Sequence, residues 1–98
     1  MNPFDLLKNM NSLRSQMAQM QGKLDSLTAT GSSGGAMVEV TINGKMEVQS
    51  IKIEESVVDP NDIKTLEVLV AAAFNNAVAE MQELLKEEAT SLATGGPR

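Results

Sequence analysis

The sequence predicts an α+β fold in which a long helix, a short antiparallel sheet and a second long helix follow one another. Three observations predict it. Apolar residues recur at alternating steps of four and three between residues 6 and 27. Valine and isoleucine then alternate with polar residues around an Asn43-Gly44 pair. Finally, a helix-starting cluster at residues 59–62 precedes a long segment with helical apolar spacing.

The first predicted helix begins at Pro3, with Asn2 as its N-terminal cap, and runs to about Leu27. Its apolar residues form a 4-3 repeat, which keeps one narrow seam on one side of the helix. So thin a stripe gives a helix little reason to stay folded alone, which implies a partner helix from this chain or from another copy. The seam consists of Leu6, Met10, Leu13, Met17, Met20, Leu24 and Leu27.

Residues 28–35 are rich in Gly, Ser and Thr and are expected to form a flexible connector. The alternation that follows predicts strands on both sides of Asn43-Gly44, a pair that favours a tight hairpin turn because both residues tolerate positive φ. Ile51 and Ile53 are out of phase with Val48 by one residue. Either a bulge or a turn into a third strand at Gln49-Ser50 explains the shift.

The second predicted helix starts with Asp59 as cap and Pro60 at its first position, and residues 63–93 can form one helix. Its first half is apolar on nearly every side, which predicts a core shared between two copies. The residues expected in this core and dimer contact are Val68, Val70, Phe74 and Ala77. The stripe Met81–Leu85 is expected to pack against Leu6–Met17 and to form a protruding arm with it. Residues 94–98 are expected to be a disordered tail. Residues 1–93 thus form a single domain.

Composition excludes several classes of function. The chain has neither Cys nor His, and its only aromatic residues are two Phe, so we expect no catalytic activity, metal, cofactor or small-molecule substrate. Asp59, Asn61 and Asp62 are expected to cap a helix and not to bind calcium. With no segment long enough to span a membrane and no basic start typical of a signal peptide, a cytoplasmic protein is expected.

Several segments together resemble the YbaB/EbfC family of bacterial nucleoid-associated proteins. They are Met17–Gln21, Val38–Gly44, Ile51–Ile53 and Leu66–Ala77. The resemblance implies a helix, a three-stranded antiparallel sheet and a helix, assembled as a tweezer-like homodimer with protruding helical arms. It favours the third strand at Gln49-Ser50. It also implies that the protein binds double-stranded DNA in the nucleoid and modulates DNA organisation or gene expression.

The resemblance attributes DNA contacts to the first and last helices. In this chain those helices carry Lys8, Asn11, Arg14, Lys23 and Lys86, which are the expected DNA-binding residues. The net charge of −5 and the acidic residues near Lys86 predict weak, salt-dependent binding. The alternative is a prefoldin-like or adaptor-type module that binds proteins through its exposed helical arms.

Overall fold

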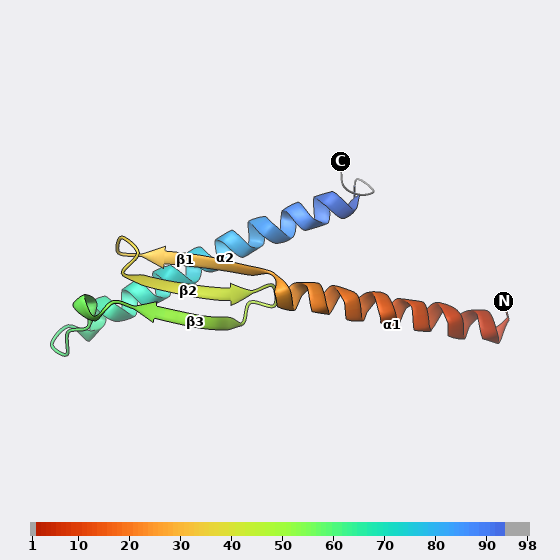
Figure 1. The fold of residues 1–98 in the computed structure, drawn as a ribbon, viewed down its shortest axis with the longest axis horizontal. Helices are drawn as coiled ribbons and strands as arrows, with labels where there is room; N and C mark the ends of the chain where they lie inside the picture. Colours follow the sequence, from red (N-terminus) through yellow and green to blue (C-terminus); the bar gives the residue numbers. More distant parts are fainter. Residues whose placement is uncertain (1, 94–98) are drawn as a thin grey trace.

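The protein consists of two long helices separated in sequence by a three-stranded sheet. The computed structural model describes residues 2–93, so the tail predicted for residues 94–98 lies outside the described residues. The elements are α1 (Pro3–Ser26), β1 (Thr28–Ser33), β2 (Val38–Asn43), β3 (Val48–Ile53), the 3₁₀ turn η1 (Glu55–Val57) and α2 (Ile63–Ala93). The predicted helix–three-stranded sheet–helix fold is confirmed, with all strands antiparallel in the order β1-β2-β3 (Figure 1).

Helix α1 starts as predicted and then runs free of the rest of the chain. Asn2 Oδ1 accepts a hydrogen bond from the Phe4 amide at 3.0 Å, and Pro3 occupies the first turn. Every side chain from residue 2 to residue 23 is exposed, and α1 has no buried residue. The helix is therefore held only near its C-terminal end.

Residues 28–33 form strand β1, so the prediction of a flexible connector over residues 28–35 is wrong for most of its length. This strand pairs with β2 along its whole length. At Gly31 it lies so close to α2 that a Cβ atom would collide with backbone atoms of Ala73 and Ala77. Because only small residues fit there, β1 lacks the large apolar residues by which a strand is recognised in a sequence.

Both hairpin loops contain residues in the left-handed backbone conformation, with positive φ. Between β1 and β2, residues 34–36 all have φ between 60° and 72°. Between β2 and β3, positive φ falls on Met46 (64°) and not on the predicted Asn43-Gly44 pair. The Met46 amide donates to Asn43 O at 2.9 Å, and the Asn43 amide donates to Glu47 O at 3.0 Å. The loop therefore has three residues, of which the third adopts the left-handed conformation usual for this class.

Strand β3 is a single strand with a bulge. Thr41 lies opposite Ser50 and Ile42 lies opposite Val48, so Gln49 is the extra residue. The bulge is thus confirmed as the cause of the phase shift, and the turn into a third strand at this point, which the resemblance favoured, is wrong. Since the bulge shifts the alternation by one residue, the apolar residues of β3 all share one face of the sheet. They are Val48, Ile51 and Ile53.

Helix α2 spans the predicted residues, but its cap is Asp62 and not Asp59. The Asp62 carboxylate accepts from the Thr65 amide at 3.3 Å and from the Thr65 hydroxyl at 2.6 Å. Asp59 closes the preceding turn instead, since its carboxylate accepts from the Asn61 amide at 2.9 Å. The predicted capping role therefore holds for Asp62 and is wrong for Asp59, and Pro60 precedes the first helical residue, Ile63.

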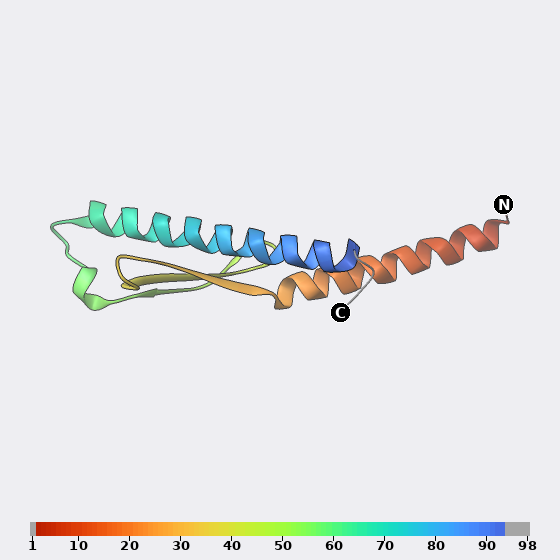
Figure 2. The ribbon, with the colours of Figure 1, turned by 90° about the horizontal axis from the view of Figure 1, so that it is seen from above.

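The core lies between α2 and one face of the sheet, and the opposite face carries no helix (Figure 2). Helix α2 packs mainly on β1 and β2 and does not cover β3. Alternation along β2 aims its apolar residues at the helix, where alanines allow close approach. The most deeply buried residues are Val38, Val40, Ile42, Ala73, Ala77 and Met81.

The chain is elongated, measuring 69 × 29 × 15 Å, with a radius of gyration of 19.5 Å, against about 13 Å for a compact domain of this length. From the same end of the sheet, α1 and the C-terminal half of α2 extend and diverge (Figure 1). The prediction that Leu6–Met17 zips against Met81–Leu85 of the same chain is wrong. Met81 is fully buried under the sheet, while Met17 is 62% exposed.

Candidate nucleic-acid interface

Helix α1 is a cationic segment of an acidic chain. Residues 6–24 contain three basic residues and no Asp or Glu, a net charge of +3. Since the whole chain carries −5, the remaining residues carry −8. The acidic residues Asp5 and Asp25 lie just outside this segment, one at each end. The positive charge is therefore concentrated on the helix that stands clear of the body.

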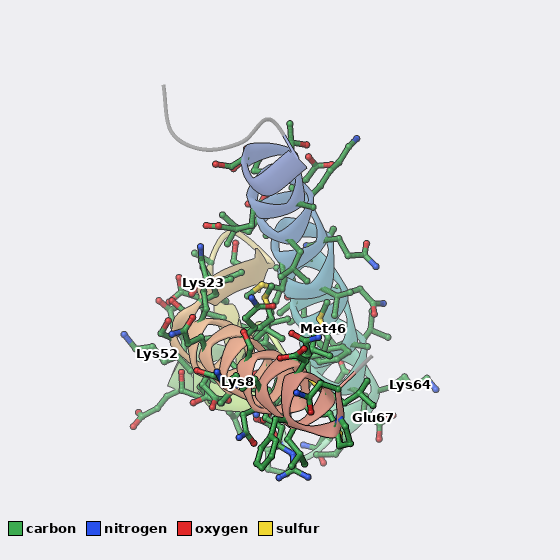
Figure 3. All side chains as sticks on the ribbon, turned by 90° about the vertical axis from the view of Figure 1, so that its right-hand side faces the viewer. Lys8, Lys23, Met46, Lys52, Lys64 and Glu67 are labelled. Atoms are coloured by element: carbon green, nitrogen blue, oxygen red, sulfur yellow. The ribbon has the colours of Figure 1, made fainter. Side chains whose placement is uncertain are left out.

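Two of the predicted DNA-binding residues, Lys8 and Asn11, lie on the side of α1 away from the seam, and Arg14 lies on its flank. At 100° per residue, Lys8, Asn11 and Arg14 lie about 200°, 140° and 80° round the helix from the line of the seam. All three side chains are exposed. Figure 3 looks onto the free end of α1 and labels Lys8 on this helix. The three residues therefore spread over about 120° of the helix surface within about 9 Å of its length, and the exposed Leu7 lies between the directions of Arg14 and Asn11.

The other two predicted residues lie elsewhere. Lys23 lies in the last turn of α1, on the opposite flank of the seam from Arg14, and its Nζ is 2.7 Å from Glu88 of α2. Lys86 is exposed on α2. Its surroundings on that helix are acidic, with Glu80, Glu83, Glu87 and Glu88. Of the five residues, Lys8, Asn11 and Arg14 are therefore the three that lie close together along the free part of α1.

The seam of α1 is bare in a single chain. Its members from Leu6 to Met20 are between 47% and 62% exposed. At the tip of the helix, Phe4 is 72% exposed. A continuous apolar row of this length on a free helix is typical of a contact surface for another helix.

A second uncovered apolar surface was missed in the sequence. Val48, Ile51 and Ile53 of β3 lie on the helix-bearing face of the sheet, but they remain 41–48% exposed because α2 does not reach them. We call these three residues the β3 row. The signal in the sequence was the phase shift itself, since a bulge places all three on one face.

The predicted core and dimer residues occupy three different environments. Ala77 is fully buried against the sheet of its own chain, and Val68 lies about 180° round α2 from it, 58% exposed. Val70 and Phe74 are half-buried and pack on the edge of the core. Phe74 lies about 160° round the helix from Asn76. The side-chain amide of Asn76 donates a hydrogen bond to Ser32 O of β1 at 2.8 Å. Phe74 is therefore on the flank of α2 nearer the β3 row.

Neither a metal site nor a membrane-spanning helix is found in the part of the chain that the structure describes. Across residues 2–93, no three acidic side chains gather closely enough to hold an ion. Within the same residues, no helix is both long and apolar enough to cross a bilayer.

Comparison with known proteins identifies the family of the chain and supports its fold. Residues 1–96 match the model of the YbaB/EbfC DNA-binding family. A nucleoid-associated protein of Paramagnetospirillum magneticum is 44% identical over 97 residues, covering 92% of this chain and 90% of that protein. One from Syntrophobacter fumaroxidans is 39% identical, covering 94% and 84%. An uncharacterised Helicobacter pylori protein shares the fold, with a TM-score of 0.72 at 24% identity over 95% of this chain and 98% of that one. The chain belongs to the YbaB/EbfC DNA-binding family.

Proposed function

We propose that the protein binds double-stranded DNA as a tweezer-like homodimer, associates with the nucleoid and modulates DNA organisation or gene expression. The observation that carries the proposal is α1, a free helix with an acid-free cationic stretch at residues 6–24. Affinity for DNA comes mainly from neutralising phosphates, and a helix that projects from the body can reach them. The relatives named as nucleoid-associated proteins support the cellular setting.

The uncovered apolar surfaces support the homodimer. One chain leaves both the seam of α1 and the β3 row exposed. Burial of such surfaces against a second copy is favourable at about 25 cal/mol per Å² of apolar area. A two-fold contact between β3 rows, flanked by Phe74 of each copy, covers the second surface and leaves the seam of each projecting α1 available to the other copy.

The dimer would contact DNA with both arms. Each copy offers Lys8 and Asn11 on the side of α1 away from its seam and Arg14 on the flank of the seam, so DNA contacts leave the seam itself for apolar contacts. Two arms on one duplex act as a bivalent clamp, which raises the affinity of individually weak contacts. The carboxylates along distal α2 oppose close approach of that helix to phosphates, so binding is weak and strongly salt-dependent.

Fluorescence polarisation with a labelled duplex, titrated at several salt concentrations, tests the proposal. Lys8→Ala and Arg14→Ala are expected to weaken binding, and removal of one phosphate contact lowers the slope of log affinity against log salt by about one. Lys64→Ala is the matched control, since this exposed lysine lies at the start of α2, away from the arms. Absence of binding by the unaltered protein at low salt, or equal effects of all three substitutions, would refute it.

A protein-binding module is the second candidate, favoured by the bare seam and by Phe4 at the tip of α1. Exposed apolar stripes on arms can hold unfolded client proteins in the manner of prefoldin-like chaperones. In that case the protein suppresses aggregation of a denatured client and does not bind the duplex at low salt. The polarisation titration, run beside a light-scattering assay of client aggregation, separates the two functions.

A further inference from the structure

The joint between α1 and the body is small. Gly44 donates its amide to Leu24 O at 2.8 Å, and a Cβ atom at Gly44 would lie 2.7 Å from that same oxygen. Lys45 forms an ion pair with Asp25 at 3.0 Å. These contacts hold the last turn of α1 against the β2–β3 loop. They join α1 to the loop and do not themselves involve α2.

Between α1 and α2 lies an apolar notch of about 120 Å³. Its walls come from the last turns of α1 and from the distal part of α2, including Leu27 and Leu85. Lys23 and Glu88 stand at its rim, and their ion pair at 2.7 Å joins the two helices directly across it. Because the notch is not filled by side chains, the ion pair is the contact best placed to determine how far the helices diverge.

We infer that Lys23 is a positioning residue for DNA binding, which acts by holding Glu88 and so sets the angle at which α1 leaves the body. The inference rests on the proposed function, since it concerns how the arms present their cations to DNA. It assigns Lys23 a role different from that of Lys8 and Arg14. Lys23 lies on the other flank of the seam, and its ammonium is engaged by a carboxylate.

The length of α1 amplifies small changes at this joint. Phe4 lies 20 residues from Leu24, about 30 Å at 1.5 Å per residue, so a rotation of roughly 10° moves the tip by about 5 Å. Adjacent phosphates on one strand are separated by a similar distance. A modest change of the angle between α1 and the body therefore decides whether Lys8 and Arg14 contact phosphates at the same time. Simultaneous contact requires an intact Lys23–Glu88 ion pair at the C-terminal end of α1.

Neutral substitutions distinguish positioning from phosphate contact because the two roles predict opposite signs. If Lys23 positions α1, Lys23→Gln and Glu88→Gln both weaken DNA binding by a similar factor, about threefold to tenfold. Neither substitution then lowers the slope of log affinity against log salt by about one, the change expected when a phosphate contact is removed. The double reversal Lys23→Glu with Glu88→Lys restores affinity. If Lys23 contacts phosphate, Glu88→Gln strengthens binding by removing a negative charge. That result overturns the inference.

A distance measurement tests the same point without DNA. The chain has no cysteine, so Ser12→Cys on α1 and Gln82→Cys on α2 provide two labelling sites for electron–electron distance measurements. Labelled chains are diluted with unlabelled chains so that distances within one copy dominate. Glu88→Gln is expected to broaden the distribution or shift it by about 3 Å, the displacement of Ser12 for a 10° rotation. The double reversal is expected to restore it.

Glu87→Gln is the matched control, since it removes the same charge from the neighbouring exposed position of α2 and leaves the Lys23–Glu88 pair intact. It is expected to leave the distance distribution unchanged. An unchanged distribution in Glu88→Gln, or an equal shift in Glu87→Gln, overturns the inference. If the unaltered protein does not bind DNA, the proposed function fails, while the distance measurement still reports on the ion pair.

Discussion

Replacing Ile51 by Asp tests whether the β3 row is the surface on which two copies meet. Ile51 lies at the centre of the row, opposite Val40, and remains 48% exposed in a single chain. The substitution therefore leaves the core of each copy largely intact. If the row is buried in the dimer, the new carboxylate is buried too, once in each copy.

The expected loss follows from this exposure. Full burial of an isoleucine side chain contributes about 1.5–3 kcal/mol, and nearly half of Ile51 remains to be covered. The apolar loss is thus about 1 kcal/mol per copy, or about 2 kcal/mol for a symmetric dimer. Desolvation of an unpaired carboxylate adds several kcal/mol for each copy. Since about 1.4 kcal/mol is a factor of ten, the dissociation constant is expected to rise by at least about 100-fold.

Sedimentation velocity over a range of protein concentrations measures this constant, and a cooperative urea unfolding transition shows that the variant keeps a folded core. Ser50→Asp is the matched control because it places the same side chain on the same strand but on the opposite face of the sheet. We expect Ser50→Asp to remain dimeric and Ile51→Asp to be a folded monomer. A dimer of unchanged affinity in Ile51→Asp, or an unaltered protein that is monomeric at micromolar concentration, would refute the reasoning.

Three further predictions concern stability, each measured as the free energy of unfolding in a urea titration. Gly31→Ala places a Cβ against the backbone of α2 and is expected to cost about 3 kcal/mol or more, whereas a loss below about 1 kcal/mol would show that β1 can move away. Ala36→Gly relieves an exposed residue with φ of 72° and is expected to stabilise by about 0.5–1 kcal/mol; a destabilised variant contradicts this. Asp62→Ala removes the cap of α2 and is expected to lower the free energy of unfolding by about 1 kcal/mol. An equal loss in Asp59→Ala would show that Asp59 and Asp62 share the capping role.

The long elements were predictable because their signals are local. The start of α1 follows from Asn2 and Pro3, and the alternation of β2 directly reports which residues face the core. Strand β1 could not be predicted, since its inward positions must be small to lie against α2 and a run of small polar residues also describes a loop. The bulge at Gln49 left a visible phase shift, but the sequence does not show whether a bulge or a turn causes it.

The candidate site was predictable as a set of basic residues on helices, but not as a geometry. The positions of Lys8, Asn11 and Arg14 relative to the seam follow from helical periodicity alone. The pairing of Lys23 with Glu88 depends on the angle between two helices that are far apart in sequence, and no local pattern encodes that angle. Similarly, the exposure of the β3 row depends on which strands α2 covers.

The bare seam links the proposed DNA contacts to assembly. An isolated helix is marginally stable in water, and α1 has no buried residue in a single chain. A second copy that covers the seam from Leu6 to Met20 would therefore stabilise the same helix that presents Lys8 and Arg14 outside the seam. Dilution below the dimer dissociation constant is then expected to lower both helix content and DNA affinity together. Full helix content in a dissociated monomer, measured by circular dichroism for Ile51→Asp, would show that α1 is stable without its partner and that the coupling does not exist.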